Sequence, residues 1–150
     1  MGQANRTIIV HAFNDDNAHK GIGFRMSGLG VDREDIRCDK DGTRPPMHKT
    51  DPHHVTFELA NRSNVELRFP ARASDAMWVS DNDRDCPESA VCHRDFRPLT
   101  VSPDGETLKV QNLNSVKKRY KFALNFIDAD NPTEVYSYDP IWDNNNGGRT

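Results

Sequence analysis

The chain has 150 residues, the usual size of one domain, and we expect a single domain over residues 1–150. Hydrophobic residues make up 35% of the chain and charged residues 29%, so a core must come from elements with a regular apolar face. The formal net charge of −3 excludes a general attraction to nucleic acid, and no apolar segment is long enough to span a membrane. We expect a cytoplasmic protein with no nucleic-acid or membrane partner.

The first strand pattern covers residues 7–13, TIIVHAF, which are β-branched or apolar at nearly every position. Such a run predicts a strand that is covered on both faces or lies at the edge of a sheet. Residues 22–26, IGFRM, alternate more weakly and predict a second strand. The stretch from Gly28 to Pro52 indicates a long loop, in which residues 31–42 form at most one or two exposed helical turns.

Residues 53–69 carry the clearest alternation. Two apolar runs with a period of two flank the turn-forming residues 61–64, NRSN. This period places the apolar side chains of a strand on one face. We predict a β-hairpin with one buried face, whose apolar residues are Val55, Phe57, Leu59, Val65, Leu67 and Phe69.

A second hairpin is predicted around residues 102–105, SPDG, because proline and glycine suit the dihedral angles of a tight turn. Leu99 and Val101 precede the turn, and Leu108 and Val110 follow it. Each pair has the spacing of residues that share one face of a strand.

Residues 119–128, RYKFALNFID, form the longest strand pattern, and we predict that they are a central strand. Its apolar face consists of Tyr120, Phe122, Leu124 and Phe126. A last, weaker repeat covers residues 134–138. Residues 143–150, DNNNGGRT, predict a flexible tail because no apolar residue follows Trp142 to anchor it.

Together these patterns predict about seven or eight short strands and little helix. Two long loops, over residues 28–52 and 81–98, interrupt the strands. The fold class that fits is all-β, with a single antiparallel β-sandwich.

The second half of the chain resembles small bacterial β-sandwich domains of the cupredoxin-like or immunoglobulin-like type. The resemblance lies in the segments MWVSDNDRDCP, LKVQNLN, KRYKFALNF and YSYDPIWDN, the last with the Asp-Pro-Ile step on which such domains often end. It covers about 75 residues and implies a fold without an activity. Blue-copper domains hold a Cys, a His and usually a Met between their last two strands, and residues 127–135, IDADNPTEV, contain none of them. We expect no cofactor.

Residues 81–93 contain the densest group of candidate metal ligands. Asp81, Asp83 and Asp85 occupy alternate positions, as carboxylates do in loops that bind calcium. The glycine and glutamate that complete an EF-hand loop are missing. The alternative is an acidic loop that is simply solvated.

The same segment contains Cys86, Cys92 and His93, whose side chains suit zinc. A fourth ligand would come from His53, His54 or Cys38. The alternatives are free thiols or a disulfide between Cys86 and Cys92.

Aromatic side chains form a second candidate surface for a ligand or a partner. These residues are Trp78, Tyr136, Tyr138 and Trp142. Tryptophan and tyrosine are enriched at binding surfaces, and the alternative is that these four pack in the core.

No catalytic residue is assigned, because the chain has neither a Gly-x-Ser-x-Gly turn nor a family pattern of cysteine and histidine. We expect a non-catalytic binding or assembly module that binds a protein partner or self-associates, for example through an edge strand. The alternative function is a metal-binding protein that binds zinc, copper or calcium with residues 81–93 and nearby histidines.

Overall fold

The computed structural model describes residues 4–28, 31–32, 35–38, 53–90, 93–113 and 118–144. These residues form an all-β fold, as the alternation predicts, with helix limited to one 3₁₀ turn and one short α-helix. The elements are β1 (Ala4–Asn14), η1 (His19–Gly21), β2 (Ile22–Gly28), β3 (Val31–Asp32), β4 (Asp35–Cys38), β5 (His53–Asn61), β6 (Leu67–Arg68), α1 (Ala73–Ala76), β7 (Met77–Val79), β8 (Glu88–Ser89), β9 (Phe96–Val101), β10 (Thr107–Asn112), β11 (Lys118–Asp128), β12 (Asn131–Tyr138) and β13 (Ile141–Asn144). The strands outnumber the seven or eight that the alternation predicts, because strands of two to four residues are too short to show alternation.

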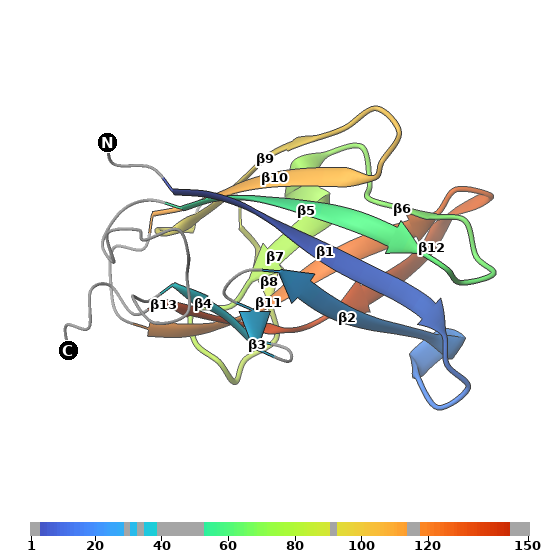
Figure 1. Ribbon diagram of the computed structural model, residues 1–150, viewed down its shortest axis with the longest axis horizontal. Coiled ribbons are helices and arrows are strands. Elements are labelled where there is room, and N and C mark those ends of the chain that lie inside the picture. Colours follow the sequence, from blue (N-terminus) through green and yellow to red (C-terminus); the bar gives the residue numbers. More distant parts are fainter. Residues whose placement is uncertain are drawn as a thin grey trace.

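The strands form two sheets that are stacked as a sandwich (Figure 1). The five-stranded sheet has the order β2-β1-β5-β10-β9. The eight-stranded sheet has the path β3-β4-β13-β11-β7-β8, and β12 and β6 also pair with β11. In Figure 1 the strands of the two layers cross at a pronounced angle. Aromatic side chains from both sheets meet in the core.

Both sheets are mixed, so the prediction of a purely antiparallel sandwich is wrong on this point. β1 runs parallel to β5, from Ala4 beside His53 to Ala12 beside Asn61. β13 runs parallel to β4 in the other sheet. Alternation indicates which face of a strand is buried and contains no information on strand direction, which depends on the connections between strands.

The predicted hairpin over residues 53–69 is wrong in its pairing and correct in its buried face. β5 lies between β1 and β10, whereas β6 pairs with β11 of the other sheet. Residues 62–66 therefore cross from one sheet to the other. The Asn61 side chain holds this crossing, since its Nδ2 donates to the Val65 carbonyl at 2.7 Å. Each sheet buries one face against the same core. Two successive strands therefore show the same alternation of apolar residues whether they pair in one sheet or lie in opposite sheets.

The second hairpin is confirmed, because β9 and β10 pair in antiparallel fashion around residues 102–105. Lys109 pairs with Thr100 and Val110 with Pro98, so Leu99 is an extra residue in β9. This bulge explains why Leu99 is 46% exposed although its position in the alternation predicts burial.

The prediction of a central strand at residues 119–128 is also confirmed. β11 pairs with four strands, β6, β7, β12 and β13. Its four apolar residues, Tyr120, Phe122, Leu124 and Phe126, are fully buried. On the opposite face, Ala123 and Asn125 are buried as well, which makes β11 the strand covered most completely on both faces.

Two further expectations for the first third of the chain are wrong. β1 is neither an edge strand nor covered on both faces, since it pairs on both sides while Ile9 is 36% exposed. Residues 31–32 and 35–38 form strands rather than helical turns, and Ile36 is fully buried. The sequence hides these two strands because a single apolar residue among charged ones shows no periodicity. The rest of the expected loop, residues 29–30, 33–34 and 39–52, lies outside the described residues.

A cluster of aromatic rings joins the two sheets. The Trp142 ring centroid lies 5.8 Å from that of Phe57 and 4.8 Å from that of Phe96, both of the five-stranded sheet. It also lies 5.1 Å from the Phe122 ring of its own sheet. Trp142 is fully buried, so the large C-terminal side chain lies at the centre of the core.

A reciprocal pair of buried amides links the sheets beside this cluster. Nδ2 of Asn112 in β10 donates to Oδ1 of Asn144 in β13 at 2.7 Å, and Nδ2 of Asn144 donates back to Oδ1 of Asn112 at 3.0 Å. Asp143 and Asn144, assigned to a flexible tail by their composition, are therefore part of β13. Residues 145–150 lie outside the described residues. No helix in the described part of the chain is long and apolar enough to cross a membrane.

We expect Asn112→Ala to lower the free energy of unfolding by about 1–3 kcal/mol, because the buried Asn144 amide then loses its partner. Urea unfolding measures this change. The control is Asn17→Ala, an exposed asparagine whose replacement should change stability by at most about 0.5 kcal/mol. Equal stabilities for the two variants would contradict a structural role for the pair.

Candidate functional site

The loop with the predicted metal ligands lines a hollow of about 430 Å³ beside β7 and β8. Asp81, Asp85, Cys86 and His93 line it. Cys86 is exposed and has no disulfide with a described residue, and Cys92 lies outside the described residues.

His93 is the most buried side chain of this group and is held by three contacts. Its Nδ1 accepts a hydrogen bond from the Asp95 backbone N–H at 3.0 Å. Its ring packs edge-on against Phe96 at 5.4 Å and against Tyr120 at 5.2 Å between centroids. Its Nε2 has no hydrogen-bond partner in the described part of the chain, and the nearest carboxylate oxygen, on Asp81, is 3.9 Å away.

Burial dominates the electrostatics around His93. It lowers the pKa of His93, and the nearby carboxylates of Asp81 and Asp95 oppose this shift without reversing it. The Tyr120 hydroxyl donates to the fully buried Asp95 carboxylate at 3.0 Å. Burial and the Asp95 charge both raise the pKa of Tyr120. The neutral forms of both rings are therefore favoured at neutral pH, as in a structural polar cluster.

The acidic side chains of the loop point toward basic residues of β11. An oxygen of Asp81 is 3.4 Å from Lys118 Nζ, and an oxygen of Asp83 is 3.3 Å from Arg119 Nε. Asp85 accepts instead from the Asn82 side chain. Among the described residues, no three or more His, Cys, Asp or Glu side chains converge as metal ligands. Metal binding by the loop stays a prediction, and the described contacts supply ion pairs for its carboxylates.

A groove around Trp78 has a volume of about 540 Å³, which is larger than the hollow at the loop and within the usual range of ligand pockets. It lies on the outer face of the eight-stranded sheet, over β7, β11 and β12. Trp78 is 40% exposed and Val135 is 43% exposed, so apolar surface faces solvent on both sides of the groove. The lining residues are Pro70, Ala71, Asp75, Trp78, Asn125, Ile127, Pro132, Val135 and Ser137.

The groove has a polar floor centred on Asn125, which is only 3% exposed. Asn125 Nδ2 donates to the Asp75 backbone carbonyl at 3.0 Å. Its Oδ1 accepts from the Ser137 hydroxyl at 2.7 Å. The amide is therefore locked in orientation at the centre of an otherwise largely apolar hollow.

The other three aromatic candidates lie on the inner side of the sheet or at its edge. Trp142 and Tyr138 are buried and pack in the core, which is the alternative to a binding role for them. Tyr136 is partly buried on the core and lies under Lys20, whose Nζ is 5.1 Å from the ring centroid. Trp78 is thus the one of the four that is largely exposed.

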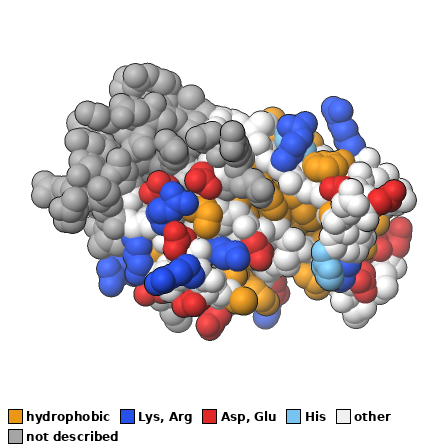
Figure 2. All heavy atoms as spheres, turned by 90° about the horizontal axis from the view of Figure 1, so that it is seen from below, with side chains coloured by type: hydrophobic (Ala, Val, Ile, Leu, Met, Phe, Trp, Pro, Cys, Tyr) orange, Lys and Arg blue, Asp and Glu red, His pale blue; other side chains and the backbone are white. Residues whose placement is uncertain are grey.

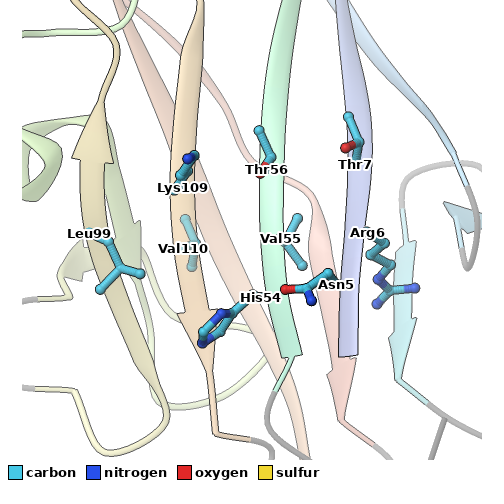
Figure 3. A pocket seen from close by; sticks show the side chains of 9 residues that line it. All are labelled: Asn5, Arg6, Thr7, His54, Val55, Thr56, Leu99, Lys109 and Val110. Carbon is cyan, nitrogen blue, oxygen red and sulfur yellow. The ribbon is translucent and has the colours of Figure 1, made fainter. Parts of the chain in front are cut away.

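The outer face of the five-stranded sheet has a smaller hollow of about 320 Å³ across β1, β5, β10 and β9 (Figure 3). Its polar residues include His54 and Lys109, and its exposed apolar residue is Leu99. The His54 ring lies beside Gln111, at 3.3 Å, on this sheet rather than at the 81–93 loop. None of its lining residues is a carboxylate.

Charge is mixed on the side of the molecule seen in Figure 2, where Lys and Arg side chains are interspersed with Asp and Glu. Hydrophobic side chains gather near the middle of the same side. The absence of a nucleic-acid partner stays a prediction from the net charge.

Reasoning from the sequence identifies Trp78 and misses the residues that form a groove with it. Val135 and Ser137 lie in a weak repeat, and Asp75 lies in a helix of four residues. The residue that could have indicated the groove from the sequence is Asn125, a polar residue inside the strongest strand pattern. A buried polar residue in a central strand needs partners, and those partners lie in the groove.

Comparisons with known proteins do not place the chain in a family. No protein-family model matches it, and no curated protein matches its sequence. Its function must therefore be inferred from the groove, the loop and the sheet edges.

Lowering the pH below about 6.5 should destabilise the protein in part through His93. Its pKa is lowered in the folded state from the usual 6.5, so the unfolded chain binds the proton more readily. The stability contributed by the neutral ring is complete above the unfolded pKa and is lost as the pH falls through the folded one. We expect His93→Gln to flatten the dependence of unfolding free energy on pH between about 5 and 7, measured by urea titrations.

The control for this measurement is His19→Gln, which replaces an exposed histidine of η1. This variant should keep the pH dependence of the wild type. A His93→Gln curve as steep as that of the wild type would show that the buried ring does not contribute.

Proposed function

We propose that the chain is a non-catalytic binding module whose contact surface is the groove around Trp78. The observation that carries the proposal is a large, exposed indole beside a hollow of ligand size on a sheet face. Tryptophan is costly to expose to water and is the residue type most enriched where proteins bind ligands and partners. β7 and β11 hold the groove in place, since Trp78 pairs with Ala123.

The surroundings of Ser80 and His93 support a non-catalytic role. The Ser80 hydroxyl lies within hydrogen-bond distance of the backbone carbonyls of Asn82 and Lys121 and donates its single proton between them, so it is used in the structure of the loop. His93 Nδ1 is occupied by the Asp95 N–H, and its Nε2 meets no hydroxyl or thiol within hydrogen-bond distance among the described residues. A nucleophile activated by a histidine requires such a contact.

Self-association through an edge strand is less well supported than binding at the groove. β9 contains Pro98, which lacks an N–H, and the bulge at Leu99. The Val135 carbonyl of β12 accepts a hydrogen bond from Lys20 Nζ at 2.6 Å. Proline, bulges and lysine are the usual means by which sheet edges avoid pairing with another chain. Pairing of a second copy with β9 or β12 is therefore disfavoured.

A panel of ligands tests the proposal by isothermal titration: the neutral oligosaccharides cellohexaose, mannohexaose and N-acetylchitohexaose, and a proline-rich decapeptide. Light scattering tests a second copy of the chain. We expect binding of at least one ligand or copy, and we expect Trp78→Ala to weaken it at least about tenfold because the main apolar contact is lost. Val135→Ser should weaken it less.

Leu99→Ala is the matched control, because it removes an equally exposed apolar side chain from the other sheet. Circular dichroism and urea unfolding confirm that each variant is folded. Binding of none of these ligands, with a monomer at all concentrations, would overturn the proposal, as would binding that Trp78→Ala leaves unchanged.

A further inference from the structure

We propose that the groove around Trp78 binds a neutral carbohydrate. This inference rests on the proposed function and names the chemistry of its ligand. A pyranose ring has a flat apolar face made of C–H groups and a rim of hydroxyl groups. The groove offers the complement of both, since an exposed indole stands beside a floor of hydrogen-bonding groups.

The apolar part of the match is formed by side chains from three segments. Trp78 of β7 supplies the flat surface, and Val135 of β12 is exposed on the other side of the floor. Pro70, from the segment between β6 and α1, also lines the groove. An aromatic face attracts C–H groups through dispersion and its negative quadrupole, without a charge on the ligand.

The polar part of the match has unused capacity for hydrogen bonds. Asn125 uses one N–H for the Asp75 carbonyl, and its second N–H has no partner among the described residues. Ser137 donates its proton to Asn125, so its oxygen remains an acceptor. The exposed Asp75 carboxylate forms no ion pair within the described part of the chain. A donor and two acceptors therefore lie along the groove, as a row of hydroxyl groups requires.

The same polar groups disfavour a purely apolar occupant. A hydrocarbon surface over the groove would remove water from the second N–H of Asn125, from the Ser137 oxygen and from the Asp75 carboxylate, and it would offer them no hydrogen bond in return. Hydroxyl groups of a ligand replace the lost water bonds.

Charge and strand geometry disfavour two further occupants. No Lys, Arg or His lines the groove, so no cation is available to pair with an anionic ligand. The Asp75 carboxylate would repel such a ligand. An extended peptide binds by adding a strand to a sheet edge. β7 and β11, which form the floor and one wall, already have strands on both sides.

Isothermal titration tests the inference with cellohexaose, mannohexaose, xylohexaose and N-acetylchitohexaose as neutral ligands. An oligomer of galacturonic acid serves as the anionic comparison, and a proline-rich decapeptide as the peptide comparison. We expect at least one neutral oligosaccharide to bind and the anionic oligomer to bind at least about tenfold more weakly. Tryptophan fluorescence follows the same titration, because Trp142 is buried and Trp78 is exposed.

Three variants separate the apolar and polar contributions. Trp78→Ala should abolish measurable binding, and Ser137→Ala and Asp75→Asn should each weaken it by roughly 3- to 10-fold. Leu99→Ala should bind as the wild type does, since it lies on the other sheet. Unfolding in urea shows whether each variant keeps its stability.

The outcomes distinguish this inference from the proposed function. Peptide binding or self-association that depends on Trp78, without binding of any neutral oligosaccharide, would overturn the inference of a carbohydrate ligand. It would still support the proposed binding function of the groove. Oligosaccharide binding that the Trp78→Ala variant retains would show that the groove is not the binding site, and would overturn the groove in both proposals. No binding of any kind would overturn both proposals.

Discussion

The fold depends on the contact of Trp142 with rings from both sheets. Phe57 and Phe96 reach it from the five-stranded sheet and Phe122 from its own, so one side chain near the end of the chain fills the space between the layers. Crossed sheets leave a wide gap between their inner faces, and large aromatic side chains fill such a gap with few voids. The buried pair of Asn112 and Asn144 then favours this alignment of the two sheets, because separation of the strands would break two buried hydrogen bonds.

The groove on the outer face follows from this arrangement of the core. β11 directs its large aromatic residues inward, and its outward positions beneath Trp78 are the small Ala123 and the polar Asn125. Small side chains in the middle of a sheet face, flanked by larger ones on neighbouring strands, leave a hollow. Ala123 pairs with Trp78 of β7 and Asn125 pairs with Ser137 of β12, so the floor of the hollow is formed by paired strands and does not depend on a loop.

The sequence predicts buried faces well and strand partners poorly. Alternation at Val55, Phe57 and Leu59 correctly identifies the buried face of β5, and the same pattern misleads on pairing, since β6 joins the other sheet. Turn chemistry succeeds where it is local, as at residues 102–105, because the sequence of a tight turn specifies its dihedral angles. The parallel pairing of β1 and β5 links residues about fifty positions apart, and no local signal encodes such a contact.

The same limit separates the two candidate sites. Spacing along the chain singles out residues 81–93, yet the structure pairs Asp81 and Asp83 with Lys118 and Arg119, which are distant in sequence. Those cations come from the first residues of β11. The residues of the Trp78 groove form no motif in the sequence, because they come from four separate segments. The dense motif at residues 81–93 thus lies in a loop whose Asp81 and Asp83 form ion pairs. The dispersed residues of the Trp78 groove form a surface with exposed apolar area and unused hydrogen-bonding groups.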